Sequence, residues 1–177
     1  MEPRPLFAGE YAVLGLLLGR PMHGYEMARY FDRDDLSEVC PIEQSLLYTY
    51  LRNVEERELV AWTEVRVGLR PPRKLYELSP GGHALVEVWL DEPVQRLREV
   101  RLEFLLKLYF LHTLDVRRER TLLGRQIDIC EQYRERLMER EAKSVGFARL
   151  VAASKRSGAE STLAWLQEYA WELEHGE

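Results

Sequence analysis

The sequence predicts a mainly α-helical protein that contains one small β-hairpin and continues into an all-helical C-terminal part. Three short helical patterns come first, over residues 9–57. A stretch rich in β-branched and aromatic residues follows, and glycine and proline interrupt it, which is typical of a hairpin. Beyond Pro93 the composition changes, because residues 94–141 contain no proline and Gly124 is their only glycine. Long helices are expected there.

Apolar spacing indicates the N-terminal helices. Gly9–Leu18 is almost wholly apolar and ends before a Gly-Arg-Pro sequence, which predicts a buried helix with a sharp stop. His23–Phe31 is a second, short helical stretch. Asp32–Glu43 holds five acids and a proline, and we interpret it as a solvated connection. The third helix, over residues 43–57, has one apolar face, made by Leu47, Leu51 and Val54.

Two short strands and a further helix complete the N-terminal part. Leu59–Val67 and Lys74–Leu78 predict the strands, and the Gly-Leu-Arg-Pro-Pro sequence between them predicts the turn. Ser79 followed by Pro80 then predicts the start of a helix that ends near Asp91. Serine is a favoured N-cap, and proline is tolerated in the first turn.

The C-terminal part predicts an antiparallel, coiled-coil-like set of helices. Phe104–Leu114 is dominated by Leu, Tyr and Phe, so it must be buried on most sides. Ser161–Glu174 has a second apolar face. A long charged helix between them carries an apolar stripe made by Leu123, Ile127, Cys130 and Leu137. We therefore divide the chain into residues 1–92 and residues 93–177.

Composition excludes several classes of protein. With 30 acids against 25 Lys and Arg residues, the net charge of −5 argues against a nucleic-acid binder in bulk, although it does not say where the charges lie. The two cysteines lie far apart with no Cys or His at metal spacing, which excludes a disulfide framework and predicts no metal. Neither a signal peptide nor an apolar run of about 20 residues is visible. We expect a cytoplasmic protein without a cofactor.

Three helices followed by a β-hairpin are the parts of a winged helix-turn-helix domain, whose third helix enters the major groove of DNA while the wing lies along the backbone. Gln44–Val54 holds no acid, and Val65–Tyr76 holds four bases and no acid. A solvated helix face is the alternative for the first segment. The candidate DNA-binding side chains are therefore Gln44, Ser45, Tyr48, Thr49 and Arg52 on the helix, and Arg70, Arg73 and Lys74 on the wing.

Several motifs, in the same order along the chain, resemble the PadR family of bacterial transcriptional regulators. They are Pro21-Met22-His23-Gly24-Tyr25-Glu26-Met27 at the second helix, Leu47-Tyr48 with Leu51 and Val54-Glu55 at the third, and Arg73-Lys74-Leu75-Tyr76-Glu77-Leu78-Ser79-Pro80-Gly81-Gly82 at the end of the wing. Glu103–Phe110 is similar to the helical dimerisation domain of longer members. The resemblance favours a phosphate contact for the Tyr25 hydroxyl, with core packing of that ring as the alternative.

One departure from the family pattern concerns the end of the recognition helix. Glu58 stands where the family has a glycine, which permits a left-handed backbone. The helix therefore either ends differently here or holds Glu58 in a strained conformation. We expect this acid and its neighbours, Glu55 and Glu56, to face away from DNA.

The resemblance implies a sequence-specific, ligand-responsive repressor that acts as a homodimer on a palindromic operator. The residues predicted to close the dimer are Phe104, Leu105, Leu108, Tyr109 and Leu111. Similar regulators often bind small aromatic or amphipathic effectors, and the candidates to line such a pocket are Trp89, Tyr109 and Trp165, with ordinary core packing as the alternative. The rival function is a winged helix that contacts proteins and not DNA. No catalytic motif is present in the sequence, so we expect no enzyme activity and no membrane partner.

Overall fold

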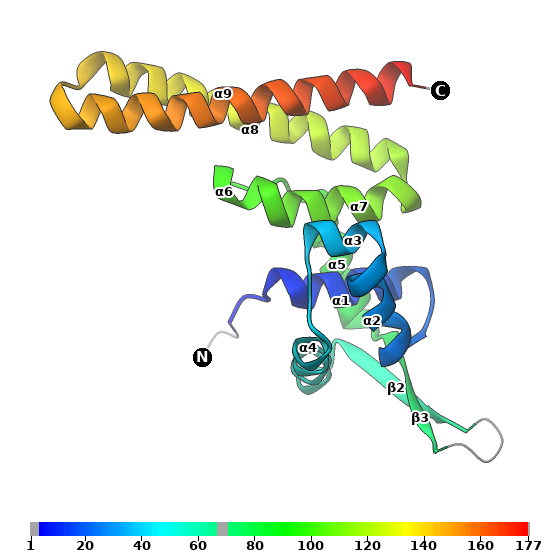
Figure 1. The fold of residues 1–177 in the computed structure, drawn as a ribbon. Helices are drawn as coiled ribbons and strands as arrows, with labels where there is room; N and C mark the ends of the chain where they lie inside the picture. The colour runs from blue at the N-terminus through cyan, green and yellow to red at the C-terminus, as the bar shows by residue number, and fades with distance from the viewer. Residues whose placement is uncertain (1–3, 67–70, 177) are drawn as a thin grey trace. The chain divides into compact units, whose positions relative to one another are not determined.

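The computed structural model describes residues 4–66 and 71–176 (Figure 1). It confirms a mainly helical fold with one small antiparallel sheet. In chain order the elements are α1 (Ala8–Gly19), β1 (Met22–His23), α2 (Gly24–Arg33), α3 (Asp35–Val39), α4 (Gln44–Glu56), β2 (Val60–Val65), β3 (Arg73–Leu78), α5 (Pro80–Asp91), α6 (Leu97–Glu99), a π-helical turn (Val100–Phe104), α7 (Leu105–Leu114), α8 (Val116–Lys143) and α9 (Gly146–His175).

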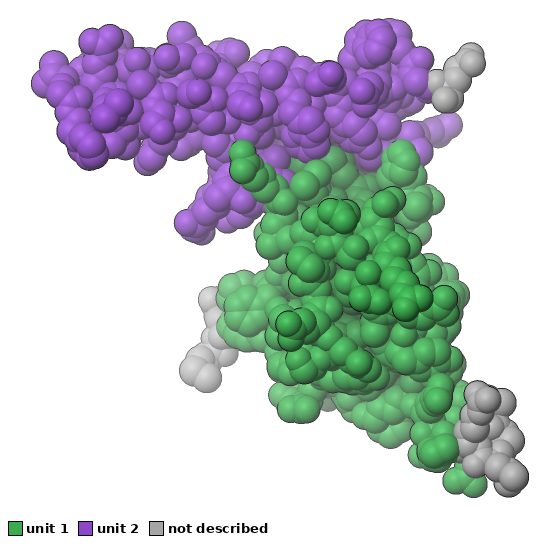
Figure 2. All heavy atoms as spheres, viewed as in Figure 1, with its two compact units in different colours: residues 1–92, 101–114 green, residues 93–100, 115–177 purple. Residues whose placement is uncertain are grey.

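The chain forms two compact units (Figure 2). Unit 1 consists of residues 1–92 and 101–114, and unit 2 consists of residues 93–100 and 115–177. The sequence predicts a boundary at residue 92, and the first of the two segments of unit 1 ends at that residue. Helix α7 follows that boundary in the chain and is nevertheless part of unit 1.

Helix α1 lies at the centre of unit 1. Residues 12–17 are all buried, as expected of a helix that is apolar on every side. Gly15 marks a close approach to α7, because a Cβ there would lie 2.3 Å from the ring of Phe110. Burying each leucine of this segment contributes about 2 kcal/mol to the free energy of unfolding. The apolar sequences of α1 and α7 therefore form one core.

The small sheet has the strand order β1-β3-β2. The predicted hairpin pairs β2 with β3 in register from Val60 opposite Leu78 to Val65 opposite Arg73. Strand β1 is an addition that the sequence did not predict, and it places Met22 opposite Tyr76. Two residues are too few to show the alternation by which strands are recognised. This strand ties the start of α2 to the wing.

The interpretation of residues 32–43 as a solvated connection is wrong. This segment contains the helix α3, whose Leu36 is completely buried. The amide of Cys40 donates to the carbonyl of Leu36 at 2.9 Å and closes the helix. A single buried leucine among acids carries no periodic signal, so the helix could not be recognised from the sequence.

The end of α4 resolves the alternatives at Glu58. The Leu59 amide donates to the Val54 carbonyl at 2.9 Å, and the Glu58 amide donates to the Glu55 carbonyl at 2.9 Å. This pair of bonds is the Schellman arrangement, which places Glu58 at the position that favours glycine. Its φ of 57° lies in the left-handed region. The helix thus ends as in the family pattern, with a strained glutamate in place of glycine.

Unit 2 is built on the antiparallel helices α8 and α9. Asp115 caps α8 by accepting hydrogen bonds from two amides of its first turn, those of Arg117 and Arg118. The buried apolar side chains of this pair are Leu122, Leu123, Cys130 and Leu137 on α8 and Ala152, Ala159, Leu163 and Leu166 on α9. Within residues 4–66 and 71–176, no helix is both long enough and apolar enough to cross a membrane.

Candidate nucleic-acid interface

Helix α4 divides into a buried and an exposed face as the spacing predicts. Leu47, Leu51 and Val54 are at most 1% exposed. The five candidate DNA-binding residues of this helix all lie on its exposed face: Gln44, Ser45, Tyr48, Thr49 and Arg52. The Thr49 hydroxyl donates to the Ser45 carbonyl at 3.1 Å, so one of these groups already has a partner within the helix.

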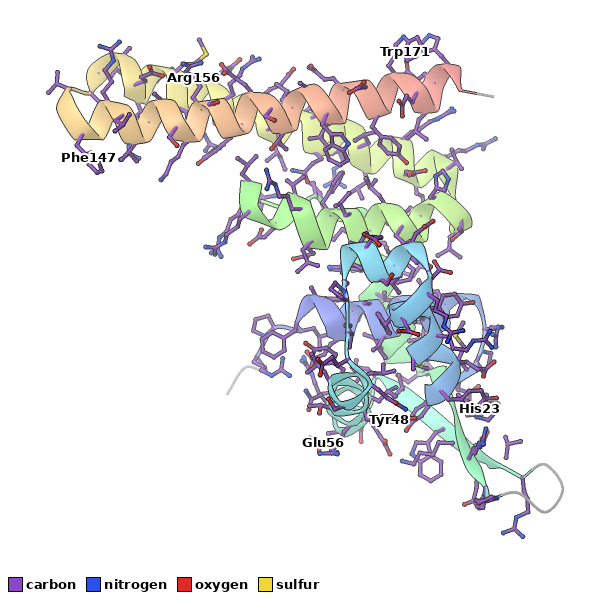
Figure 3. The ribbon with its side chains drawn as sticks, viewed as in Figure 1. His23, Tyr48, Glu56, Phe147, Arg156 and Trp171 are labelled. Carbon is purple, nitrogen blue, oxygen red and sulfur yellow. The ribbon has the colours of Figure 1, made fainter. Side chains whose placement is uncertain are left out.

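A surface hollow of about 580 Å³ joins the start of α2, helix α4 and strand β3. Its lining residues are His23, Gly24, Tyr25, Tyr48, Arg73, Lys74 and Tyr76. Four of the predicted DNA-binding side chains therefore meet at one place, although three different elements supply them. Tyr48 on α4 and His23 at the start of α2 are labelled in Figure 3.

Tyr25 lies open to solvent at this hollow. Its side chain is 43% exposed, which excludes the alternative of an aromatic ring packed in the core. The guanidinium of Arg73 lies 4.9 Å from the centre of the Tyr25 ring, and the imidazole of His23 stacks on the same ring with the two ring centres 5.3 Å apart. The Tyr25 ring and the Arg73 guanidinium thus lie near each other at the amino end of a ten-residue helix, where anions are favoured.

His23 fixes the geometry of that helix end. Its backbone amide donates to the Glu26 carboxylate at 2.8 Å, and its Nδ1 lies 2.8 Å from the carbonyl oxygen of Lys74. The pKa of Glu26 lies below its usual value, because the His23 amide and the Arg20 guanidinium outweigh the effect of burial, which alone would raise it. The turn, helix α2 and strand β3 are therefore held together by polar contacts.

Two of the three wing bases predicted to bind DNA lie in the described residues, and they differ in their surroundings. Arg73 is exposed beside Tyr25, whereas the Lys74 ammonium lies 3.0 Å from the Glu55 carboxylate. Arg70, the third predicted wing base, lies outside the described residues. Glu55 and Glu56 line a second hollow, of about 570 Å³, together with Tyr48, Arg52, Lys74 and Tyr76. Glu55 and Glu56, which the sequence predicts to face away from DNA, therefore lie beside several of the predicted DNA-binding side chains.

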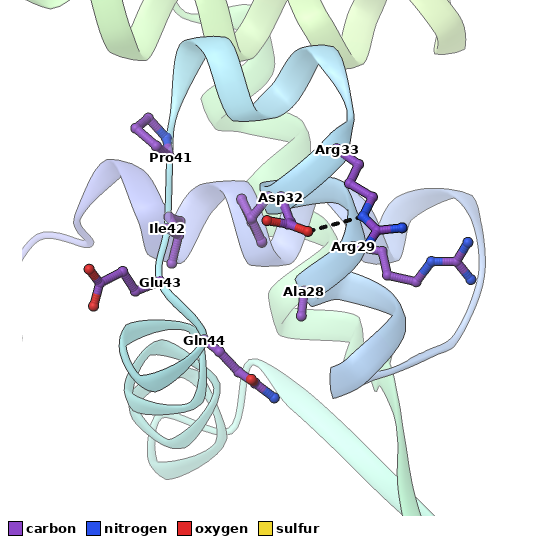
Figure 4. A pocket seen from close by; sticks show the side chains of 9 residues that line it. Ala28, Arg29, Asp32, Arg33, Pro41, Ile42, Glu43 and Gln44 are labelled. Atoms are coloured by element: carbon purple, nitrogen blue, oxygen red, sulfur yellow. Dashed lines mark hydrogen bonds and ion pairs between the residues drawn. The ribbon is translucent and has the colours of Figure 1, made fainter.

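A third hollow, of about 710 Å³, lies between α2 and the segment that leads into α4 (Figure 4). Ala28, Arg29 and Phe31 contribute from α2, and Pro41 to Gln44 contribute from the other side. Arg33 and Asp32 form an ion pair at its edge, with a separation of 3.1 Å. None of the predicted effector-binding aromatics lines this hollow.

The aromatic residues predicted to line an effector pocket are divided between the units. Trp89 is buried in unit 1, where its ring stacks on Tyr11 at 4.5 Å and its indole N–H donates to Glu103 at 2.8 Å. Tyr109 also belongs to unit 1, and its hydroxyl donates to Asp34 at 2.9 Å. Burial, and then this carboxylate, raise the pKa of the Tyr109 hydroxyl. Trp165 belongs to unit 2 and is 38% exposed.

Most of the residues predicted to close a dimer are buried within the single chain. Phe104 and Leu111 are completely buried within the single chain, and Leu108 is 5% exposed. These three side chains therefore have no surface to offer a partner, and Tyr109 is bonded to Asp34. The apolar run of α7 packs in unit 1 instead. Leu105 and Tyr109 are half-buried. Of these two, Leu105 is the one whose side chain has no polar group that needs a hydrogen-bond partner.

An exposed polar face on α4, the amino end of α2 beside it, and a wing that joins both define a winged helix-turn-helix domain of the DNA-binding type. A family model described as the transcriptional regulator PadR-like family matches residues 13–88. Residues 13–88, which hold the motifs of the winged domain, therefore match a family of transcriptional regulators, as the sequence predicts.

Two curated proteins and one solved structure illustrate the relationship. The negative transcriptional regulator PadR of Bacillus subtilis is 26% identical over 134 residues, 76% of this chain and 68% of that protein. A probable transcriptional regulator of Mycobacterium tuberculosis is 33% identical over 91 residues, 51% of this chain and 48% of that protein. The crystal structure of B. subtilis PadR in complex with operator DNA has the same fold, with a TM-score of 0.50, 22% identity and coverage of 94% and 98% of the two chains.

Proposed function

We propose that this regulator binds a palindromic operator in the cytoplasm as a homodimer, with α4 in the major groove of each half-site. The observation that carries the proposal is the hollow where Tyr25, Tyr48 and Arg73 meet beside the acid-free segment Gln44–Val54 of α4. In this arrangement the amino end of α2 and the wing contact phosphates, and the face of α4 reads base edges. Arg52 has two available roles, a bidentate guanine contact or a phosphate contact.

The test is the salt dependence of DNA binding in an Arg73→Ala variant. Because each neutralised phosphate contributes about −0.9 to the slope of log affinity against log salt, we expect the slope to become shallower by about 0.9 for each Arg73 in contact. The matched control is Arg98→Ala, which removes an exposed arginine from α6 and should leave the slope unchanged. Fluorescence anisotropy with a duplex selected from a random pool measures both.

The two functional hypotheses give different results in this titration. Binding of the wild-type chain that weakens steeply with salt supports the regulator that docks on DNA. Binding that is absent, or that does not respond to salt, would support the alternative of a winged helix that contacts only proteins. An unchanged slope in the Arg73 variant would remove the wing from the proposed interface.

We place the dimer contact on unit 2, at the turn between α8 and α9. Four apolar side chains there are more than half exposed: Met138 at 51%, Val145 at 85%, Phe147 at 78% and Leu150 at 62%. Phe147 is labelled at this end of the helix pair in Figure 3. Adjacent apolar residues with such exposure mark a contact surface in a protein that is otherwise highly charged. A second copy would cover them across a two-fold axis.

Phe147→Glu combined with Leu150→Glu is expected to convert the dimer into monomers, because two charges would have to be desolvated at the contact. Sedimentation equilibrium measures the change, and we expect a rise in the dimer dissociation constant of at least about tenfold. Phe147→Leu keeps an apolar side chain and should remain dimeric. A double variant that dimerises like the wild type would place the contact elsewhere.

A small aromatic or amphipathic effector belongs to the same proposal. Such a ligand changes operator affinity only by binding more tightly to one of two conformations of the dimer. Trp89 and Tyr109 of unit 1 and, separately, Trp165 of unit 2 are the residues that the sequence proposes as contacts for such a ligand.

A further inference from the structure

A carboxylate on the recognition helix joins that helix to both strands of the wing. Glu55, near the end of α4, accepts a hydrogen bond from the indole N–H of Trp62 on β2 at 2.5 Å. The same carboxylate accepts two from the ammonium of Lys74 on β3, at 3.0 and 3.1 Å. The Glu55 carboxylate therefore connects three elements, and its partners lie up to 19 positions away in the sequence.

The hairpin register places both donors on the same face. Trp62 lies opposite Tyr76 in the ladder, and Lys74 lies two residues before Tyr76 on β3. Residues two apart on a strand share a face, so the indole and the ammonium point the same way. The ammonium nitrogen lies 4.0 Å from the centre of the Trp62 ring, a cation–π distance. Lys74 is thus held by a carboxylate and by an aromatic face.

This arrangement places a negative charge on the surface proposed to bind DNA. Glu55 lines the second hollow together with Tyr48, Arg52 and Lys74. Burial alone would raise the pKa of Glu55, but the hydrogen bonds from Lys74 and Trp62 outweigh burial and lower it, so the carboxylate is ionised at neutral pH. An ionised acid here repels phosphate and neutralises the nearest wing cation.

We propose that Glu55 is a specificity-determining positioning residue, which withholds the Lys74 charge from phosphates and fixes the wing against the recognition helix. The inference rests on the proposed function, because it assigns a role within the same interface. Non-specific complexes depend on phosphate contacts alone, so withholding one cation weakens them. An operator complex also depends on α4 and the wing having the correct relative positions, which the Glu55 contacts provide. Discrimination between operator and random DNA therefore increases.

The test compares Glu55→Gln, Lys74→Met and the combination of both. Glutamine keeps the size of the side chain and an acceptor for the Trp62 indole, but it loses the charge that holds Lys74. With a random-sequence duplex, we expect Glu55→Gln to bind more tightly, with a salt slope steeper by about 0.9. When the salt concentration rises from roughly 50 to 200 mM, the affinity of the variant should therefore fall about 3.5-fold further than that of the wild type. The ratio of operator to random-duplex affinity should fall.

The double variant separates release of Lys74 from a general change of charge. In the Lys74→Met background, Glu55→Gln should leave the slope unchanged, because no ammonium is there to be released. The indole N–H resonance of Trp62, assigned by comparison with Trp62→Phe, should shift in Glu55→Gln and so report that the contact exists in solution. This measurement does not depend on DNA.

Each failure has a different meaning. Wild-type protein that shows no salt-dependent DNA binding would overturn the proposed function and the inference with it. Salt-dependent wild-type binding with an unchanged slope in Glu55→Gln would overturn the inference alone. A steeper slope that persists in the Lys74→Met background would also overturn it, because the effect would then be long-range repulsion and not the holding of Lys74.

Discussion

Replacing Gly82 with alanine is expected to lower the free energy of unfolding by about 3 kcal/mol, near the upper end of the effect of overpacking. A Cβ at this position would lie 1.9 Å from the carbonyl oxygen of Leu59 and 2.8 Å from its carbonyl carbon. Neither group can move easily, because the Leu59 carbonyl accepts the Ser79 amide at 3.0 Å and the Gly82 amide donates to the Ser79 hydroxyl at 3.0 Å. The close approach joins the first turn of α5 to the start of the wing.

The neighbouring glycine provides the control for this prediction. A Cβ on Gly81 would have the Ser79 hydroxyl at 3.8 Å as its nearest neighbour, an ordinary contact. Both glycines lie in the first turn of α5, so Gly81→Ala should be neutral or stabilise the fold by about 0.4–1 kcal/mol through the unfolded chain. Urea unfolding of both variants measures the difference. Similar midpoints for the two variants would show that Leu59 yields to the added methyl group.

The fold was predictable wherever a repeating pattern extends over a full element. Leu47, Leu51 and Val54 predict α4 because one helical face is buried, and the Ser79-Pro80 start of α5 follows from capping chemistry, since the Ser79 hydroxyl accepts the Gly82 amide. Helix α3 and strand β1 were missed, because five residues and two residues are too short for periodicity. Tertiary contacts decide such elements.

The assignment of the α7 residues shows a different limit. An apolar run such as Phe104–Leu111 predicts burial, but the sequence does not say against which surface the run is buried. The same residues would suit a partner's surface or the chain's own core. Here the chain supplies the neighbour, because Gly15 of α1 leaves room for the Phe110 ring. That complementarity spans 95 positions in the sequence, and single-chain periodicity does not report it.

The sequence predicts which residues form the candidate site, but it does not predict which of their side chains contact one another. The absence of acids from Gln44–Val54 correctly predicts an exposed polar face. The contacts of Glu55 with Trp62 and Lys74 depend on how the hairpin lies against α4, and no spacing encodes them. The sequence signal that could have drawn attention to this cluster is the presence of Trp62 on a strand, where the structure leaves it exposed.

Glu10 is the buried carboxylate on which the N-terminal segment depends. Its side chain is completely buried and accepts hydrogen bonds from the Arg4 guanidinium at 2.6 and 2.9 Å, the Phe7 amide at 2.8 Å and the Asn53 side chain at 2.8 Å. Burial alone would raise the pKa of Glu10, but these donors together lower it below its ordinary value of 4.5. The ionised carboxylate of Glu10 therefore connects the residues before α1 with α4.

Glu10→Gln is expected to lower the free energy of unfolding at pH 7 by about 3 kcal/mol, because charged hydrogen bonds become neutral and one amide group lacks an acceptor. A lowered pKa in the folded state means that the wild-type contribution is fully present above about pH 4.5 and is lost as the pH falls through the folded pKa. The difference between wild type and variant should therefore shrink in acid. Urea unfolding between pH 3 and 7 measures it, with the exposed Glu77→Gln as a control that should track the wild type. A difference that stays constant across this range would show that Glu10 acts through its shape and not through its charge.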